Sequence, residues 1–390
     1  MDLTLDADKL VALARETTAL NDLGEDTWQE GLERLIASFH ADARLTDMGK
    51  VIAAGEIVMY LSTRLGVVEY HRQHPEIARA PITRPIVVIG QPRTGTTILY
   101  DLLAQDPANR APLTWEVDRP LPPPEAATYD IDPRIDEVQA QLDMVEQIMP
   151  GFMGMHPLGA RLAQECVRIT GQDFRSLIFS TQYRVRSYSR WLVDQADMAP
   201  AYRWHRLYLQ LLQSKHQRNR WVLKSPAHQW CLPALLAEYP DALLVQTHRD
   251  PLRVTASLSS LMTTLRKLAS DDIDVRDIAE EWVGYIVAAM DRSVDAREDG
   301  TIPKDQVVDV HFRDFLADPF GTIRGIYDSF GLDLTDDAEQ RMRAFLAENP
   351  SEKHGGHHYT FADTGLDEAA VRARTKRYQE YFDVPPENLS

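Results

Sequence analysis

The sequence is poor in cysteine and in positive charge. Its 390 residues include two cysteines, Cys166 and Cys231, and the 42 lysines and arginines are outnumbered by 59 aspartates and glutamates, for a formal net charge of −17. Two cysteines are too few for a disulfide framework, which is typical of a protein from a reducing cytoplasm. The acidic balance argues against general binding of nucleic acids or anionic membranes. Any anionic ligand therefore needs a locally basic pocket.

Long uninterrupted apolar runs are also missing. The first ten residues are acidic and lack the basic-then-apolar order of a signal peptide. The most apolar early stretch, residues 51–70, contains Glu56, Arg64 and Glu69. It therefore predicts an amphipathic helix packed on the protein and no transmembrane segment, although a peripheral membrane contact stays open. We expect a cytoplasmic protein.

Residues 86–107 carry the most informative pattern. A run of β-branched residues from Ile86 to Ile89 predicts a buried strand, Gly90 ends it, and Gly95 opens a helix. A strand, a glycine-bounded loop and a helix in this order form a phosphate cradle, because loop amides and the helix N-terminus point at an anion.

Strands alternate with helices further along the chain, which predicts an α/β class. We expect a P-loop-like three-layer fold with a central parallel sheet flanked by helices. Residues 1–80 predict a helical N-terminal extension. Residues 81–390 predict the α/β domain, with a helical insertion at about 131–215 that is rich in methionine and aromatic residues and suits an apolar acceptor pocket.

The loop departs from the P-loop pattern G-x-x-x-x-G-K-[ST] at one position. The chain has Gly90-Gln-Pro-Arg-Thr-Gly-Thr-Thr97, so Thr96 stands where a nucleotidase keeps its lysine. The cation is Arg93, inside the loop, which can fork two bonds to a phosphate or sulfate. Such a loop predicts binding of a phosphate-like group without Mg²⁺-nucleotide chemistry.

The segment PRTGTT resembles the 5′-phosphosulfate loop of sulfotransferases that use 3′-phosphoadenosine 5′-phosphosulfate (PAPS). The resemblance implies that this loop binds the donor through Gln91, Pro92, Arg93, Thr94, Gly95, Thr96 and Thr97. The family also has an arginine at the end of a later strand and a serine eight positions on, which hold the 3′-phosphate. Arg249 and Ser257 match both positions. The guanidinium of Arg249 can donate two hydrogen bonds to a dianion, and the hydroxyl of Ser257 can donate another.

Catalytic candidates come from two further segments. Lys224 and Ser225 match a lysine-threonine-histidine motif of cytosolic family members, which implies that Lys224 stabilises charge on the leaving phosphate oxygen. Pro226 stands where those enzymes have a catalytic histidine. The acceptor proton then needs another base, and two candidates stay open: Glu116, past the loop helix, and His228.

Near the C-terminus, a glycine-containing basic stretch resembles the loop with which related enzymes close over the donor. This implies donor contacts from Lys353, Gly355 and Gly356. Histidines surround them, but no paired cysteines or second ligand cluster accompany them, so the sequence predicts no metal.

These observations together predict transfer of a sulfuryl group from PAPS to a hydroxyl of a small, apolar or lipid-like acceptor, with release of adenosine 3′,5′-bisphosphate. PAPS is the expected co-substrate and a small molecule the expected partner, and a homo-oligomer stays open. One alternative is a P-loop kinase or NTPase, which the missing lysine disfavours. Another is a catalytically inactive nucleotide-binding protein on the same fold.

Overall fold

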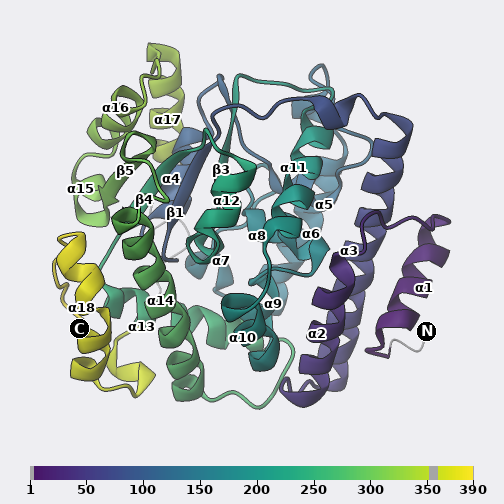
Figure 1. Cartoon of the computed structure of the whole chain (residues 1–390), viewed down its shortest axis with the longest axis horizontal. Coiled ribbons are helices and arrows are strands. Elements are labelled where there is room, and N and C mark those ends of the chain that lie inside the picture. The colour runs from purple at the N-terminus through teal and green to yellow at the C-terminus, as the bar shows by residue number, and fades with distance from the viewer. Residues whose placement is uncertain (1–3, 351–358, 390) are drawn as a thin grey trace.

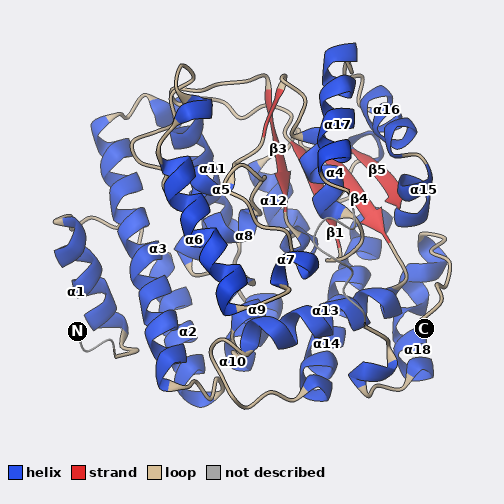
Figure 2. Ribbon diagram, turned by 180° about the vertical axis from the view of Figure 1, so that it is seen from behind, coloured by secondary structure: helices blue, strands red, loops and turns tan. Residues whose placement is uncertain are grey.

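The centre of the molecule is a parallel five-stranded sheet. The computed structural model describes residues 4–350 and 359–389. The strands run in the order β2-β3-β1-β4-β5, and all four neighbouring pairs are parallel. Their bounds are β1 Ile86–Gly90, β2 Asn109–Arg110, β3 Arg220–Lys224, β4 Leu243–His248 and β5 Val307–His311. Figure 2 shows the strands gathered in one half of the molecule with helices on both sides.

The central strand β1 is buried on both faces because its side chains alternate between two hydrophobic layers. Val87 and Ile89 pack with Leu223 under α11 (Ala199–Gln213) and α12 (Leu232–Glu238). Ile86 and Val88 pack against the other layer, which comes from α4 (Thr96–Leu103), α16 (Pro319–Ser329) and α17 (Asp336–Glu348). This is the predicted α/β fold with a central parallel sheet flanked by helices.

The N-terminal residues form α1 (Ala7–Thr18), α2 (Trp28–Ala41) and α3 (Asp47–Gln73). They lie at one end of the long axis, and the C-terminus lies at the other (Figure 1). Their apolar faces share one core with α9 (Ile178–Gln182), α10 (Arg186–Asp194) and Ala289 of α14 (Val275–Glu298). The three helices are therefore packed on the middle and later parts of the chain.

Within the described residues, α3 is long and apolar enough to cross a membrane by length and composition alone. Its most apolar 18-residue window is 44% buried inside the protein. Arg64, near its middle, is 3% exposed and forms an ion pair of 3.1 Å with the buried Asp173. A charge paired inside the protein is what a core helix shows.

The remaining helices connect and cover these layers. In chain order they are α5 (Thr114–Asp118), α6 (Arg134–Ile148), α7 (Phe152–Met155), α8 (Cys166–Thr170), α13 (Pro251–Arg266), α15 (Phe312–Ala317) and α18 (Glu368–Tyr381). The helices α13, α14 and α18 pack together beside β4 and bring the end of the chain next to the carboxyl edge of the sheet (Figure 1).

Candidate active site

The site lies where β1, β3 and β4 end side by side. β1 is paired with β3 on one side and with β4 on the other. After β1 the chain forms β2 and β3 on one side of it and then β4 and β5 on the other side, so the strand order reverses at β1. In open α/β sheets a ligand crevice forms at such a switch point, outside the carboxyl ends of the strands. The predicted residues of three segments lie at these strand ends: the 91–97 loop follows β1, Lys224 is the last residue of β3, and Arg249 follows β4.

The loop after β1 is held in a strained conformation. Gly90 has φ 140° and a Cβ there would lie 2.2 Å from Thr247 Oγ1, while Gly95 has φ 86° as it opens α4. Arg93 also has a positive φ, 70°, which costs a non-glycine residue about 1 kcal/mol. Thr94 fixes the turn, because its hydroxyl donates to Gln91 O at 2.7 Å. The conformation is thus maintained by its neighbours, as is usual for ligand loops.

The loop also opens the first turn of α4. Gly95 is the N-cap, and no side chain of the described residues caps the helix there. Thr96 and Thr97 begin the helix, with Thr96 buried and Thr97 half-buried. Gln91 turns away, since its side-chain amide donates to Gln229 Oε1 at 2.7 Å. The helix N-terminus therefore presents amides and a threonine hydroxyl to the crevice.

A cluster of arginines lies on one side of the loop. Arg93 Nε donates to Ser257 Oγ at 2.9 Å, and its Nη1 donates to Met155 O at 2.7 Å. Arg249 Nη1 donates to Arg93 O at 3.0 Å, and its guanidinium lies 4.2 Å from the ring centroid of Phe312. The structure thus brings together Arg93, Arg249 and Ser257, which the sequence predicts as donor-binding residues.

Arg253 extends this cluster and was not among the residues predicted from the sequence. It lies on the first turn of α13, and its guanidinium lies 5.4 Å from the ring centroid of Tyr359. Its Nε is 4.0 Å from Glu387, and Glu387 also forms an ion pair with Arg249 at 3.0 Å. Arg249 lies outside α13, before its N-cap Asp250, so no helical periodicity in the sequence links the two arginines.

Lys224 lies on the other side of the loop with an unpredicted partner. Its ammonium forms an ion pair with Glu165 and a hydrogen bond of 3.3 Å to Thr97 Oγ1. Burial by itself raises the pKa of Glu165, but the charge of Lys224 and its hydrogen bond to the carboxylate oppose this, and the pKa lies below the ordinary value. Glu165 is therefore an ionised carboxylate beside the predicted sulfuryl-binding residues. It precedes α8 outside any recognisable motif.

Two other titratable groups adjoin this pair. Burial lowers the pKa of His156 to about 4, which keeps the imidazole neutral at pH 7. Burial raises the pKa of Asp101, one turn after Thr97 on α4, to about 7, although the charge of Lys224 opposes this. Both groups respond to the low polarity around Lys224, which strengthens electrostatic interactions there.

The two predicted bases lie in different surroundings. Glu116 is fully buried in α5, where it accepts hydrogen bonds of 2.8 Å from Arg110 Nη2 and 3.0 Å from Leu113 N. His228 is 2% exposed, and its Nδ1 is 2.7 Å from Tyr202 Oη. Burial lowers the pKa of His228 to about 3. The role of either residue as the base stays a prediction.

A small cavity of about 20 Å³ adjoins the Lys224–Glu165 pair. His228 and Tyr202 line it together with Ser225 and Cys166, the chain neighbours of Lys224 and Glu165. Its other walls are mainly apolar and include Leu177, Leu192, Val193, Met198 and Trp230. The volume holds about one water, so a larger ligand needs the walls to move.

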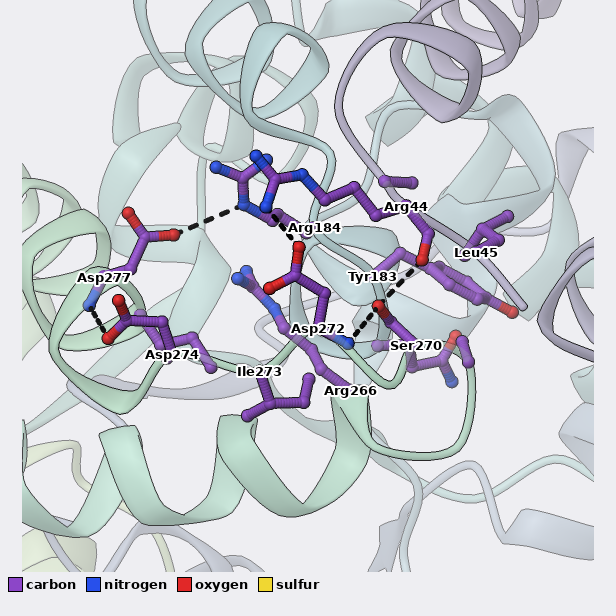
Figure 3. Close-up of a pocket in the computed structure, with 14 residues that line it drawn as sticks. Arg44, Leu45, Tyr183, Arg184, Arg266, Ser270, Asp272, Ile273, Asp274 and Asp277 are labelled. Carbon is purple, nitrogen blue, oxygen red and sulfur yellow. Dashed lines mark hydrogen bonds and ion pairs between the residues drawn. The ribbon is translucent and has the colours of Figure 1, made fainter.

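A larger pocket of about 230 Å³ lies away from these residues (Figure 3). It joins the link between α2 and α3 to the segment between α13 and α14. Its cations are paired: Arg44 with Asp272, Arg184 with Asp277 at 3.3 Å, and Arg266 with Glu281 at 2.8 Å. Paired charges of both signs give it no preference for an anionic donor.

Three predicted donor residues, Lys353, Gly355 and Gly356, lie outside the described residues. Across residues 4–350 and 359–389, no group of three or more His, Cys, Asp or Glu is arranged to hold a metal ion.

Comparisons with known proteins find the same fold in sulfotransferases. The structure is similar to sulfotransferase STF1 from Mycobacterium tuberculosis H37Rv, with 33% identity, a TM-score of 0.85 and coverage of 95% of this chain and 98% of that one. It is also similar to sulfotransferase STF9 from Mycobacterium avium, with 32% identity, a TM-score of 0.90 and coverage of 100% and 99%.

A curated relative is the omega-hydroxy-beta-dihydromenaquinone-9 sulfotransferase Stf3 of Mycobacterium tuberculosis (strain CDC 1551 / Oshkosh). It is 24% identical over 281 residues, which are 71% of this chain and 70% of the relative. Residues 85–337 match the profile of the sulfotransferase family. The predicted resemblance to sulfotransferases is thereby confirmed, and the chain belongs to the sulfotransferase family.

Proposed function

We propose that this protein transfers a sulfuryl group from PAPS to a hydroxyl of an apolar, lipid-like acceptor. The observation that carries the proposal is the placement of cations on both sides of one phosphate loop. Arg93, Arg249 and Ser257 adjoin one another on one side, and Lys224 contacts Thr97 on the other. A 3′-phosphate on the first group and a 5′-phosphosulfate over the helix N-terminus would satisfy both.

We assign the base to Glu165 in preference to Glu116 or His228. Glu165 is ionised and directly contacts Lys224, whereas both oxygens of Glu116 are bonded within its own segment. In the reaction the acceptor oxygen bonds to sulfur while Glu165 takes the hydroxyl proton. The bond from sulfur to the bridging oxygen breaks, and its electron pair stays on the 5′-phosphate. Lys224 stabilises this growing charge.

The acceptor is proposed from the cavity beside this pair. Apolar side chains make up most of its walls, and Arg175, which also lines it, is paired with the buried Asp173 at 3.1 Å. The hydroxyls of Thr170, Ser176, Tyr202 and Ser225 and the ring of His228 are its other polar groups. Once the walls of this small cavity have moved apart, such a lining favours a hydrocarbon or aromatic body with one hydroxyl. The curated relative, whose name gives a menaquinone-derived acceptor, supports the same class.

Calorimetric binding of adenosine 3′,5′-bisphosphate and of adenosine 5′-phosphate tests the donor. Wild type should prefer the bisphosphate, and Arg249→Ala should weaken its binding about 10- to 100-fold, because a charge-assisted fork is lost. Arg313→Ala is the matched control, since Arg313 is 80% exposed on α15. Equal binding of both nucleotides to the wild type would refute a PAPS donor.

A further inference from the structure

We propose that Glu387 occupies the position of the donor's 3′-phosphate and that the donor enters by displacing it. The inference rests on the proposed function and adds a residue that sets donor affinity and specificity. Glu387 belongs to residues 383–389, which follow α18 and carry no recognisable motif. We call residues 383–389 the C-terminal segment.

The carboxylate of Glu387 is bound as a phosphate would be. Arg249 Nε donates to its two oxygens at 3.0 and 3.2 Å, and Arg249 Nη2 donates to Oε2 at 3.1 Å. This is the face of the guanidinium that suits a forked anion, and Arg249 Nη1 is meanwhile held by the loop carbonyl of Arg93. Arg249 is 13% exposed and Glu387 33% exposed, so the contact is partly shielded from water.

The C-terminal segment is anchored so that this side chain reaches the fork. Glu387 N donates to Asp250 Oδ2 at 2.6 Å, and Asp250 is held in turn by Arg372 through bonds of 2.7 and 2.8 Å. Leu389 packs against a buried cluster that includes Leu252. Asp250 directly follows Arg249, so this hydrogen bond holds the backbone of Glu387 close to Arg249, and the Glu387 carboxylate can contact the guanidinium.

The charges favour exchange of this carboxylate for a phosphate. Arg93, Arg249 and Arg253 gather here, and the single carboxylate of Glu387 is 4.0 Å from Arg253 Nε, beyond hydrogen-bond distance. That Nε is buried and makes no hydrogen bond within the described structure. A phosphate dianion has more oxygens and more charge, so it can satisfy Arg249 and the open Arg253 donor together.

Displacement has a consequence for nucleotide choice. A nucleotide with a 3′-phosphate gains the arginine cluster and must remove Glu387 from it, whereas one with a 3′-hydroxyl leaves the ion pair in place. Glu387 therefore lowers the affinity for 3′-phosphorylated nucleotides alone. Since donor and bisphosphate product share the 3′-phosphate, the same exchange weakens product binding and aids its release.

The test is titration of Glu387→Gln and Glu387→Ala with adenosine 3′,5′-bisphosphate and adenosine 5′-phosphate. Removal of a partly exposed competing ion pair should tighten bisphosphate binding about 3- to 10-fold. Binding of adenosine 5′-phosphate should stay within about twofold, because the competing contact affects the 3′-phosphate alone. Glu380→Gln is the control, since Glu380 pairs with Lys376 at the surface of α18.

Unchanged or weaker bisphosphate binding in both variants would overturn the inference, because Glu387 would then be neutral or would support Arg249. The proposed function would survive that result as long as the wild type still prefers the bisphosphate. If the wild type shows no such preference, the proposed donor itself fails. The two failures are therefore distinguishable.

Discussion

Replacement of Glu165 by glutamine tests the chemistry most directly. The amide keeps the size of the side chain and can still accept a hydrogen bond from Lys224 Nζ, but it cannot take a proton. Loss of a positioned general base lowers kcat about 10²- to 10⁴-fold, which corresponds to about 3–5 kcal/mol in the barrier. We therefore expect a large fall in kcat, measured in single turnovers with saturating donor.

The same change has opposite effects on stability and donor binding. Lys224 is 1% exposed and would lose its charged partner, which costs on the order of 3–5 kcal/mol. For a chain of this length that amounts to a melting temperature lower by about 5 °C. The anionic donor would restore a partner for Lys224, so it should bind at least as tightly as in wild type and recover part of the stability.

Glu116→Gln is the comparison that can refute this reasoning. It removes the charged partner of the buried Arg110, so we expect lower stability but retained kcat in the fraction that is folded. If Glu165→Gln keeps most of its kcat while folded Glu116→Gln loses it, the base is Glu116 and our assignment is wrong. Donor titration and thermal unfolding of both variants separate these cases.

Two further predictions concern stability. Burial lowers the pKa of His205 to about 3, so between that value and the ordinary value of about 6.5 the unfolded chain binds a proton that the folded protein excludes. The free energy of unfolding must then fall as the pH falls from 6.5, by up to about 1.4 kcal/mol per pH unit for this histidine. In urea titrations from pH 6.5 to 5, the free energy of unfolding of His205→Gln should depend less on pH than that of the wild type, by about half a proton at pH 6.5 and nearly one proton at pH 5. An equal pH dependence in both proteins would contradict the burial argument. Arg64→Met should destabilise the protein by about 3–5 kcal/mol, because it leaves Asp173 buried with one ion-pair partner fewer. Arg72→Met, which removes the exposed partner of Glu69, should leave the free energy of unfolding nearly unchanged, because solvent screens this pair. Similar losses in both variants would refute a special role for the buried pair.

Local patterns determined much of the donor side of the site. The expected strand 86–89 is β1, and residues 220–224 form β3, because runs of β-branched and apolar residues between turn signals leave few other buried structures. Gly90 and Gly95 could also be recognised in the sequence as turn positions, because the positive φ at both positions favours glycine. The fold class follows from such local signals, because alternating strands and helices can bury their apolar faces in few ways.

Only the tertiary structure shows which carboxylates pair with the cations of the site, because these carboxylates come from distant segments of the chain. Glu165 is 59 residues from Lys224 and Glu387 is 138 from Arg249, and neither carboxylate belongs to a motif. An isolated acid in a sequence is ordinarily a solvated surface residue, so nothing local distinguishes these two. They become candidates because the parallel strands end at one edge of the sheet, where Lys224 and Arg249 lie. The start of α8 brings Glu165 to Lys224, and the C-terminal segment brings Glu387 to Arg249. Residue type and spacing specify the cradle, whereas the packing of remote chain segments decides which carboxylates face it.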